Sequence, residues 1–276
     1  MTKSGKYQSD IEAILARRYD NGRDYWTTPD QGLIKGGPFS TLSSAMMLLE
    51  LGMDASDPVL SHVAGLIFSC LREDGRIKTS PKGAIYPCHT INALNVLCHL
   101  GYATDQRLNK TFQHLFDIQH HDGGWRCNKF SYGKGPETES SNPFPTLTAL
   151  DAFRFTDHLN TASVLDRAVD FLLQHWEIRT PIGPCHYGMG TLFMQVEYPF
   201  ATYNLFYYVY VLSFYHRARK DPRFLEALQA LEAQTVGGEI LVQRVNNKID
   251  KLSFCKKGEI SELGTKRYRE LKHNLA

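Results

Sequence analysis

The sequence lacks a concentration of charge of either sign. It holds 31 Lys and Arg residues against 29 Asp and Glu residues, which gives a formal net charge of +2 over 276 residues. The basic residues are spread along the chain. Proteins that bind nucleic acid present a concentrated basic face to the phosphates, so we expect no nucleic-acid partner.

Long hydrophobic runs are also absent from the sequence. The most apolar stretch, residues 205–215, is shorter than the roughly 20 residues that a membrane-spanning helix needs. The start of the chain shows no succession of basic, apolar and cleavage regions such as a signal peptide has. We therefore expect a cytoplasmic protein that is not an integral membrane protein.

The cysteines do not form the short framework of a small disulfide-rich secreted domain, and no Cys-x-x-Cys spacing occurs. The six are Cys70, Cys88, Cys98, Cys127, Cys185 and Cys255. Such a spread predicts reduced thiols. Cys70 and Cys98 lie within apolar helical stripes, and we expect them in the core.

What the sequence does contain is a repeat. The motif Pro-x-x-Thr followed by a bulky apolar residue begins at Pro38, Pro87, Pro143 and Pro199, at spacings of 49, 56 and 56 residues. Each copy opens a run with the apolar periodicity of a helix. Proline suits a helix start because its missing N–H lies among donors that have no partner inside the helix. The four copies therefore predict four helices that begin near these prolines.

A second helix is predicted after each of the first helices. Several begin at an acidic residue that can cap the helix, namely Asp57, Asp105 and Asp221. Glycine-rich turns end them at residues 74–76, 122–125 and 236–238. The third copy carries a long loop over residues 177–198 in place of this turn.

Single helices are predicted at the two ends of the chain. Residues 10–19 look like the second helix of a half-repeat, and residues 261–271 look like a first helix around Thr265. A closed ring of hairpins needs an outer helix at one end and an inner helix at the other. We predict one all-α domain over residues 1–276, an α/α toroid with inner and outer helix rings. An open helical solenoid is the alternative, since it uses the same hairpin unit.

Residues 119–125, which read Gln-His-His-Asp-Gly-Gly-Trp, resemble the repeat signature of squalene–hopene cyclases and protein prenyltransferase β-subunits. One turn carries the full signature, and the hairpin period extends the resemblance over most of the chain. The resemblance implies an α/α toroid and chemistry on isoprenoids. It also implies that Asp122 and Trp125 have structural roles, because in that superfamily these turns chiefly pack neighbouring outer helices.

The next residues resemble the loop of protein farnesyltransferase β-subunits. The resemblance implies that Arg126 and Lys129 bind a prenyl diphosphate, for which their charges and donors are suitable. A solvated basic loop is the alternative. Two departures prevent a direct transfer of chemistry. Tyr132 and Lys134 stand where prenyltransferases carry a zinc-binding Asp-x-Cys, and the Asp-x-Asp-Asp acid of terpene cyclases is missing from the chain.

A Cys-His pair occurs twice after a proline, as Cys88-His89 and as Cys185-His186. Cysteine and histidine are the ligands that zinc prefers. In a toroid the inner-helix N-termini gather at one mouth of the barrel, where Cys127 would join the two pairs. We therefore predict that these five residues bind a metal ion, with zinc as the candidate cofactor. The alternative is that each is an ordinary buried or capping residue.

Residues 132–142 form a loop that is too long and too polar for a minimal hairpin connection. Long loops in compact domains often carry function. Glu137 and Glu139 in this loop are candidates for a catalytic acid or base, with solvated carboxylates as the alternative. Tyr132 in this loop and Tyr187 after the second Cys-His pair are candidates for substrate binding.

The fourth predicted inner helix is unusually rich in aromatic residues. Tyr203, Tyr207 and Tyr210 share one face with Phe206 and Phe214. Such a wall suits an isoprenoid chain and can stabilise a carbocation through the ring quadrupoles. We therefore predict that the three tyrosines bind substrate; ordinary core packing is the alternative.

Two functional hypotheses follow from these patterns. The first is a prenyltransferase-like or terpene cyclase-like protein that binds an isoprenoid or similar apolar ligand in the barrel, with zinc at its mouth. The second is a non-catalytic toroid that binds a lipid-like ligand or a protein partner. Carbohydrate-active α/α barrels rank behind both. They need paired carboxylates on inner helices, where Glu50 and Asp151 are among the few recognisable ones.

Overall fold

The regular secondary structure of this chain is helical. The computed structural model describes residues 5–276, and within them only isolated β-bridges accompany the helices. The α-helices are α1 (Gln8–Leu15), α2 (Thr41–Glu50), α3 (Pro58–Ser69), α4 (Pro87–Leu97), α5 (Asn109–Asp117), α6 (Pro143–Phe153), α7 (Ser163–Ile178), α8 (Thr191–Met194), α9 (Leu205–Leu212), α10 (His216–Arg219), α11 (Pro222–Glu232) and α12 (Glu262–Leu275). Short 3₁₀ and π segments are η1 (Gly37–Phe39), η2 (Cys98–Tyr102), η3 (Gln106–Leu108), η4 (Pro136–Glu139) and η5 (Ser253–Cys255). The predicted all-α class is confirmed.

Proline and aspartate begin several of these helices, as the sequence predicts. Pro87 and Pro143 are the first residues of α4 and α6. Asp57 and Asp221 cap α3 and α11, each by accepting the backbone N–H two residues later, at 2.8 and 2.9 Å. A cap of this kind stabilises a helix by about 1 kcal/mol.

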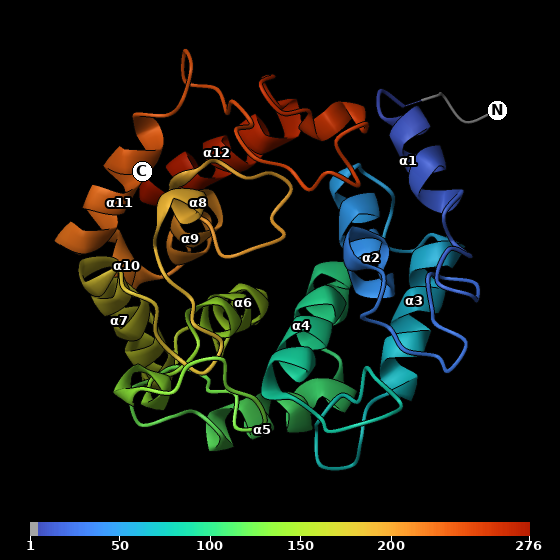
Figure 1. The fold of residues 1–276 in the computed structure, drawn as a ribbon, viewed down its shortest axis with the longest axis horizontal. Helices are drawn as coiled ribbons and strands as arrows, with labels where there is room; N and C mark the ends of the chain where they lie inside the picture. The colour runs from blue at the N-terminus through green and yellow to red at the C-terminus, as the bar shows by residue number, and fades with distance from the viewer. Residues whose placement is uncertain (1–4) are drawn as a thin grey trace.

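Five helices lie around the centre of the molecule. In chain order α2, α4, α6, α9 and α12 each pack against the next, and Figure 1 shows them set out around a common centre. Every residue of α9 is buried, and so is every residue of α6 except Phe144. A helix that is apolar and buried all round belongs to the interior of a protein. These five are called the inner helices below.

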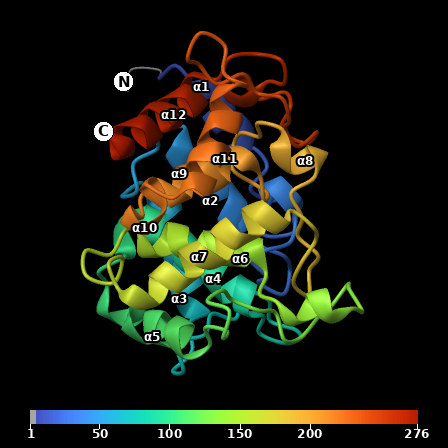
Figure 2. The same cartoon turned by 90° about the vertical axis from the view of Figure 1, so that its left-hand side faces the viewer.

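The remaining long helices cover the inner ones. α1 and α3 pack on α2, α5 packs on α4, α7 on α6, and α11 on α9. Figure 2 shows α7 and α11 in front of α6 and α9. In α7, Leu165, Leu172 and Trp176 are buried while other positions remain exposed, as expected for a helix with one covered face.

One hydrogen bond recurs where a turn meets the following inner helix. The hydroxyl of Thr90 accepts the N–H of Ile77, two residues after Gly75, at 3.1 Å. Thr146 and Thr265 accept the N–H groups at the same position after their preceding turns, both at 3.0 Å. The threonine therefore ties an inner helix to the turn before it, which explains why this residue type recurs.

Two of the turns need glycine for both conformation and space. Gly75 and Gly123 have φ angles of +82° and +95°, in the left-handed region. A Cβ atom at Gly75 would lie 2.2 Å from the backbone oxygen of Lys110, and one at Gly123 would lie 2.4 Å from that of Arg167. Both glycines therefore let a turn approach the next outer helix closely.

The fourth copy of the motif departs from the prediction that a helix begins near Pro199. α9 begins six residues later, at Leu205, and the side chain of Asn204 caps it by accepting a backbone N–H at 2.9 Å. The hydroxyl of Thr202 donates to the Glu197 carboxylate instead of accepting from a turn. Asn204 is a strong N-cap, and it sets the start of this helix.

The two ends of the described chain are joined. Asp10 in α1 is 4% exposed, and its carboxylate accepts the N–H and the hydroxyl of Ser253 at 2.9 and 2.7 Å and the N–H of Phe254 at 3.0 Å. Closer to the centre, Glu50 at the end of α2 pairs with Arg267 of α12, with Nε and Oε1 2.9 Å apart. Two buried or mostly buried carboxylates therefore join α1 to η5 and α2 to α12.

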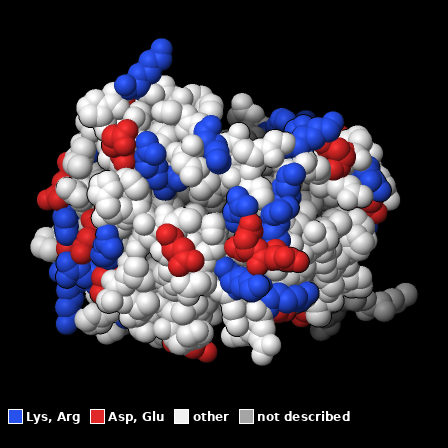
Figure 3. All heavy atoms as spheres, turned by 90° about the horizontal axis from the view of Figure 1, so that it is seen from below, with Lys and Arg blue, Asp and Glu red and all other residues white. Residues whose placement is uncertain are grey.

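The surface shows no large region of one charge sign on the face seen in Figure 3, where basic and acidic side chains are interspersed. Within residues 5–276, no helix has the length and apolar character needed to cross a membrane.

We predict that Arg267→Ala lowers the free energy of unfolding by about 2–3 kcal/mol, because it leaves the mostly buried Glu50 carboxylate without its cation. Urea denaturation measures this change. Arg269→Ala is the matched control, since Arg269 lies on the same helix with 71% of its side chain exposed, and it should cost less than about 0.5 kcal/mol. An equal decrease in the free energy of unfolding in both variants would contradict the stabilising role of the Glu50–Arg267 pair.

Candidate functional site

A cavity of about 330 Å³ lies between the inner helices and is open to solvent beside Asn92 and Ala201. All five helices contribute to its mostly apolar lining. The lining includes Leu42, Met46, Glu50, Cys88, His89, Asn95, His99, Phe144, Asp151, Tyr187, Tyr198, Phe200, Tyr207, Tyr210 and Arg267. Pockets for small molecules typically measure about 300–1,000 Å³ and combine apolar walls with a few polar groups, as this one does.

Aromatic rings form one wall of the cavity. Tyr207 and Tyr210, two of the tyrosines predicted to bind substrate, line it from α9. The ring of Phe200 lies against both, with centroid distances of 5.0 and 5.2 Å. Phe144 of α6 faces Tyr207 at 6.4 Å. These four rings come from two helices and a loop, and together they present an apolar surface to the cavity.

Tyr203, the third of these tyrosines, lies outside the lining. Its hydroxyl is hydrogen-bonded to Nδ1 of His175 at 2.9 Å, and its ring packs against Phe193 at 4.8 Å. Burial lowers the pKa of His175 to about 4, so the imidazole is neutral at pH 7. The prediction placed Tyr203 on the helix face of Tyr207, but the late start of α9 leaves it ahead of the helix.

A polar cluster faces the cavity around Asp151, which is 2% exposed. Its Oδ2 atom accepts hydrogen bonds from Nδ2 of Asn95 at 3.0 Å and from the hydroxyl of Tyr207 at 2.9 Å. Nε2 of His99 lies 3.0 Å from the same oxygen, and Nε of Arg154 donates to Oδ1 at 2.6 Å. Burial alone would raise the pKa of Asp151, but the charge of Arg154 and the contacts with His99 outweigh burial and hold it well below the usual range.

The Asp151 carboxylate also determines which ring nitrogen of His99 carries a hydrogen in the neutral imidazole. An ionised carboxylate only accepts hydrogen bonds, so Nε2 of His99 carries the hydrogen that points to Asp151. In the neutral ring Nδ1 is then the acceptor. An imidazole oriented by a buried carboxylate is the usual arrangement of a general base, and His99 lines the cavity.

Glu50 is the second carboxylate that lines the cavity. It is paired with Arg267 and accepts a hydrogen bond from the hydroxyl of Tyr198. Tyr210 donates to Glu270 at 2.8 Å, and Arg267 donates to the same carboxylate at 2.9 Å. Glu50 and Asp151 are thus each held by an arginine. They do not provide the free acid and base that carbohydrate-active barrels need.

Three of the five predicted metal ligands lie together. Burial and the neighbouring Cys127 and Cys185 raise the pKa of the Cys88 thiol to about 12. Burial and the neighbouring Cys127 raise that of Cys185 to about 11. Tyr187 lies beside all three thiols, and burial raises its pKa further than they do. Cys88, Cys127 and Cys185 are called the thiol cluster below; it borders the cavity, since Cys88 and Tyr187 line it.

The two histidines predicted as ligands take other partners. The ring of His89 lies 4.9 Å from that of Tyr86, and Nε2 of His186 is bonded to Oε1 of Glu137 at 3.0 Å. Within residues 5–276, no three His, Cys, Asp or Glu side chains are arranged so that they could hold a metal ion. The structure therefore brings the cysteines near one another but does not assemble the predicted ligands as one set.

The predicted diphosphate ligands lie outside the cavity lining. Nε of Arg126 donates to the backbone oxygen of Thr138 at 3.0 Å, and its Nη2 lies 3.7 Å from the Glu139 carboxylate. Lys129 is exposed. Their loop lies before α6, and neither cation lines the cavity between the inner helices.

The other loop candidates are also at the surface. Glu137 bonds to His186, and this contact, ahead of all others, lowers the pKa of Glu137. The side chain of Glu139 is 79% exposed, and Tyr132 is 71% exposed. The backbone N–H of Tyr132 donates to Pro184 at 2.7 Å, which joins this loop to the one that carries Cys185. The loop is therefore joined to the segment next to Cys185, and of its two carboxylates Glu139 faces solvent while Glu137 pairs with His186.

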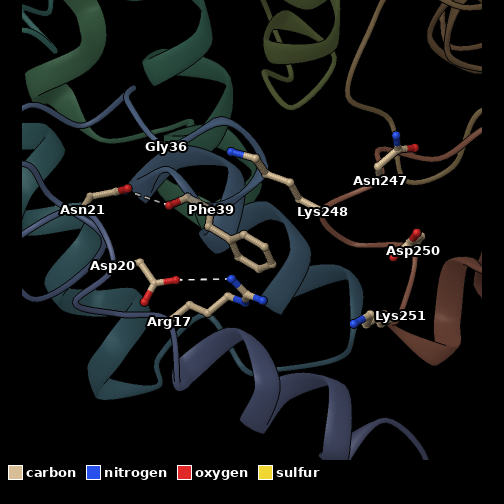
Figure 4. Close-up of a pocket in the computed structure, with 9 residues that line it drawn as sticks. All are labelled: Arg17, Asp20, Asn21, Gly36, Phe39, Asn247, Lys248, Asp250 and Lys251. Carbon is tan, nitrogen blue, oxygen red and sulfur yellow. Dashed lines mark hydrogen bonds and ion pairs between the residues drawn. The ribbon is translucent and has the colours of Figure 1, made fainter.

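A second hollow, of about 430 Å³, lies at the surface beside the segment 247–251 (Figure 4). Its lining mixes charges of both signs. Nη1 of Arg17 is 3.3 Å from Asp20, and its guanidinium lies 4.5 Å from the ring centroid of Phe39. Lys248 borders this hollow while the adjacent Ile249 lines the central cavity, so this segment separates the two.

Sequence reasoning missed most of the polar lining. Asn95 and His99 are four residues apart in and just after α4, a spacing that places both on one side of a helix. A polar Asn95 within an otherwise apolar stripe was the signal that could have found them. Arg267 gave no such signal, because its partner Glu50 is 217 positions away.

No protein-family model matches the sequence, and no curated protein matches it. The functional argument therefore rests on the contacts described above.

We predict that Asp151→Asn lowers the free energy of unfolding at pH 7 by about 3–5 kcal/mol, because it leaves the buried Arg154 guanidinium without its anion. A carboxyl group whose folded-state pKa is depressed stabilises the fold above its unfolded pKa of about 3.9, and this contribution is lost as the pH falls below it. The difference in the free energy of unfolding between wild type and Asp151→Asn should therefore become smaller as the pH falls from 5 to 3.

Urea denaturation across this pH range measures the gap. Asp170→Asn is the control, since Asp170 pairs with Arg217 at the exposed surface and should change stability little. A gap for Asp151→Asn that does not vary with pH would show that the ionised carboxylate is not what stabilises the cluster.

Zinc at the thiol cluster stays a prediction. We expect about one zinc ion per chain in protein purified without chelator or nickel resin, measured by elemental mass spectrometry, and its loss in Cys185→Ala. Cys70→Ala is the control, because Cys70, the C-cap residue of α3, is not part of the thiol cluster and does not line the cavity. A well-folded preparation without metal would rule the prediction out, as would a metal content that Cys185→Ala leaves unchanged.

Proposed function

We propose that this chain is an α/α toroid of the squalene cyclase and prenyltransferase type that binds a small isoprenoid or similar apolar molecule between its inner helices. The observation that carries the proposal is the aromatic-walled cavity of about 330 Å³ at the centre of the fold.

The contacts between the chain ends support a toroid over an open solenoid. In a solenoid each hairpin contacts only its neighbours, so the first and last helices stay apart. Here Asp10 binds Ser253 and Phe254, and Glu50 pairs with Arg267. These contacts connect α1 and α2 with the last part of the described chain.

The size and chemistry of the cavity support a small apolar ligand. An apolar cavity of about 150 Å³ accepts benzene, so about 330 Å³ has room for a molecule on the order of ten to fifteen carbon atoms. The rings of Phe144, Phe200, Tyr207 and Tyr210 offer large apolar area to such a molecule. A ten-carbon isoprenoid fits this description.

The charges around the cavity favour a neutral ligand over a diphosphate. Arg267 lines the cavity, but Glu50 and Glu270 already engage its guanidinium. Arg126 and Lys129 lie elsewhere on the chain surface. This arrangement favours the second hypothesis, a binding module, over transfer of a prenyl diphosphate.

A metal at the mouth is the remaining part of the proposal. The thiol cluster supplies soft sulfur ligands of the kind that zinc prefers, and it borders the cavity. Bound zinc would supply a Lewis acid there. Its binding would require the three thiols to draw together and a further ligand to join them.

We predict that a ten-carbon isoprenoid alcohol, geraniol, raises the melting temperature by about 3 °C at a concentration tenfold above its Kd. Met46→Trp should abolish this rise, because the larger side chain fills the cavity that Met46 lines. Differential scanning calorimetry measures both effects.

Met53→Trp is the matched control, since Met53 follows α2 but lies outside the cavity lining, and it should respond to the alcohol as wild type does. A rise in melting temperature that persists in Met46→Trp would place the binding site elsewhere. The absence of any rise in wild type would contradict the proposed function.

A further inference from the structure

Asn95 carries a buried acceptor with no partner. The residue is 5% exposed and lines the cavity, and its Oδ1 atom has no hydrogen-bond partner within the described part of the chain. Buried polar atoms in folded proteins are nearly always hydrogen-bonded, and an unmet acceptor is unfavourable. The Oδ1 atom itself is buried, but Asn95 lines the cavity, so a molecule bound in the cavity is a source for the missing donor.

The neighbouring carboxylate fixes which atom of the amide is left over. Nδ2 of Asn95 lies 3.0 Å from Oδ2 of Asp151, and an ionised carboxylate can only accept. The amide must therefore turn its NH₂ group to Asp151. The reversed orientation would set two acceptors against each other, so the free atom is the oxygen.

The groups around Asn95 are already satisfied and electrically balanced. The charge of Asp151 is matched by Arg154, whose Nε donates to it at 2.6 Å. The hydroxyl of Tyr207 donates its hydrogen to the same carboxylate, and Nε2 of His99 is hydrogen-bonded to it as well. The missing partner is therefore a neutral donor rather than a cation.

The rings of Phe144 and Phe200 lie against Tyr207 of this cluster and line the cavity. The neighbouring Thr148 also lines it, and its hydroxyl already donates to the backbone oxygen of Phe144. On the basis of the proposed binding of an apolar molecule in this cavity, we infer that its ligand is an alcohol. The hydroxyl group donates to Oδ1 of Asn95, and the hydrocarbon part lies against the aromatic wall.

Isothermal titration calorimetry with geraniol and with its methyl ether tests this assignment. The two share a carbon skeleton, but the ether cannot donate a hydrogen bond. Wild type should bind the alcohol about tenfold more tightly than the ether, a difference typical of one buried hydrogen bond. In Asn95→Leu the preference should fall below about twofold, with the affinity for the ether retained.

Asn92→Leu is the matched control. Asn92 lies on the same helix and lines the cavity but is exposed rather than buried, so this variant should keep the preference for the alcohol. Equal binding of alcohol and ether by wild type would overturn the assignment without any variant, and so would a preference that survives in Asn95→Leu.

Two further outcomes separate this inference from the proposed function. Tighter binding of geranylamine than of geraniol by wild type would overturn the neutral donor and leave the cavity as a binding site. Failure of wild type to bind the alcohol, the ether or the amine would contradict the proposed function itself.

Discussion

The ion pair between Glu50 and Arg267 joins the first inner helix to the last, and the cavity between the inner helices depends on it. Without this contact α2 and α12 would each present an uncovered side, as the terminal units of an open array do. Asp10 makes the corresponding connection on the outer side by binding Ser253 and Phe254. Both connections use a carboxylate with little exposure, where a charged hydrogen bond is strong and its loss leaves a charge without a partner.

The same pair also shapes the chemistry of the cavity. Glu50 and Asp151 both line it, and each is neutralised by an arginine. Their charges therefore stabilise the wall and are not available to a ligand. The rest of the lining includes aromatic surface, an oriented imidazole on His99 and Asn95, whose Oδ1 atom has no partner within the described residues. This combination suits a neutral, mostly apolar molecule with one donor.

The sequence predicted well what local interactions decide. The starts of α4 and α6 follow from proline, and the recurring threonine follows from its bond to the preceding turn. It predicted poorly what distant contacts decide. Tyr203 does not line the cavity with Tyr207 and Tyr210, because α9 begins only after Asn204, which caps it. His186 does not lie with the three cysteines as a ligand, because its ring is bonded to Glu137. Cys88, Cys127 and Cys185 did come together, since the loops that precede the inner helices meet beside the cavity.

The most direct test of the central claim is a crystal structure of the protein grown with a brominated ten-carbon alcohol, located by the anomalous signal of bromine. The account predicts a bromine peak between the inner helices, beside Phe200 and Tyr207, with the alcohol oxygen near Oδ1 of Asn95. A bromine peak in the surface hollow beside Arg17 and Lys248, with only water between the inner helices, would contradict it.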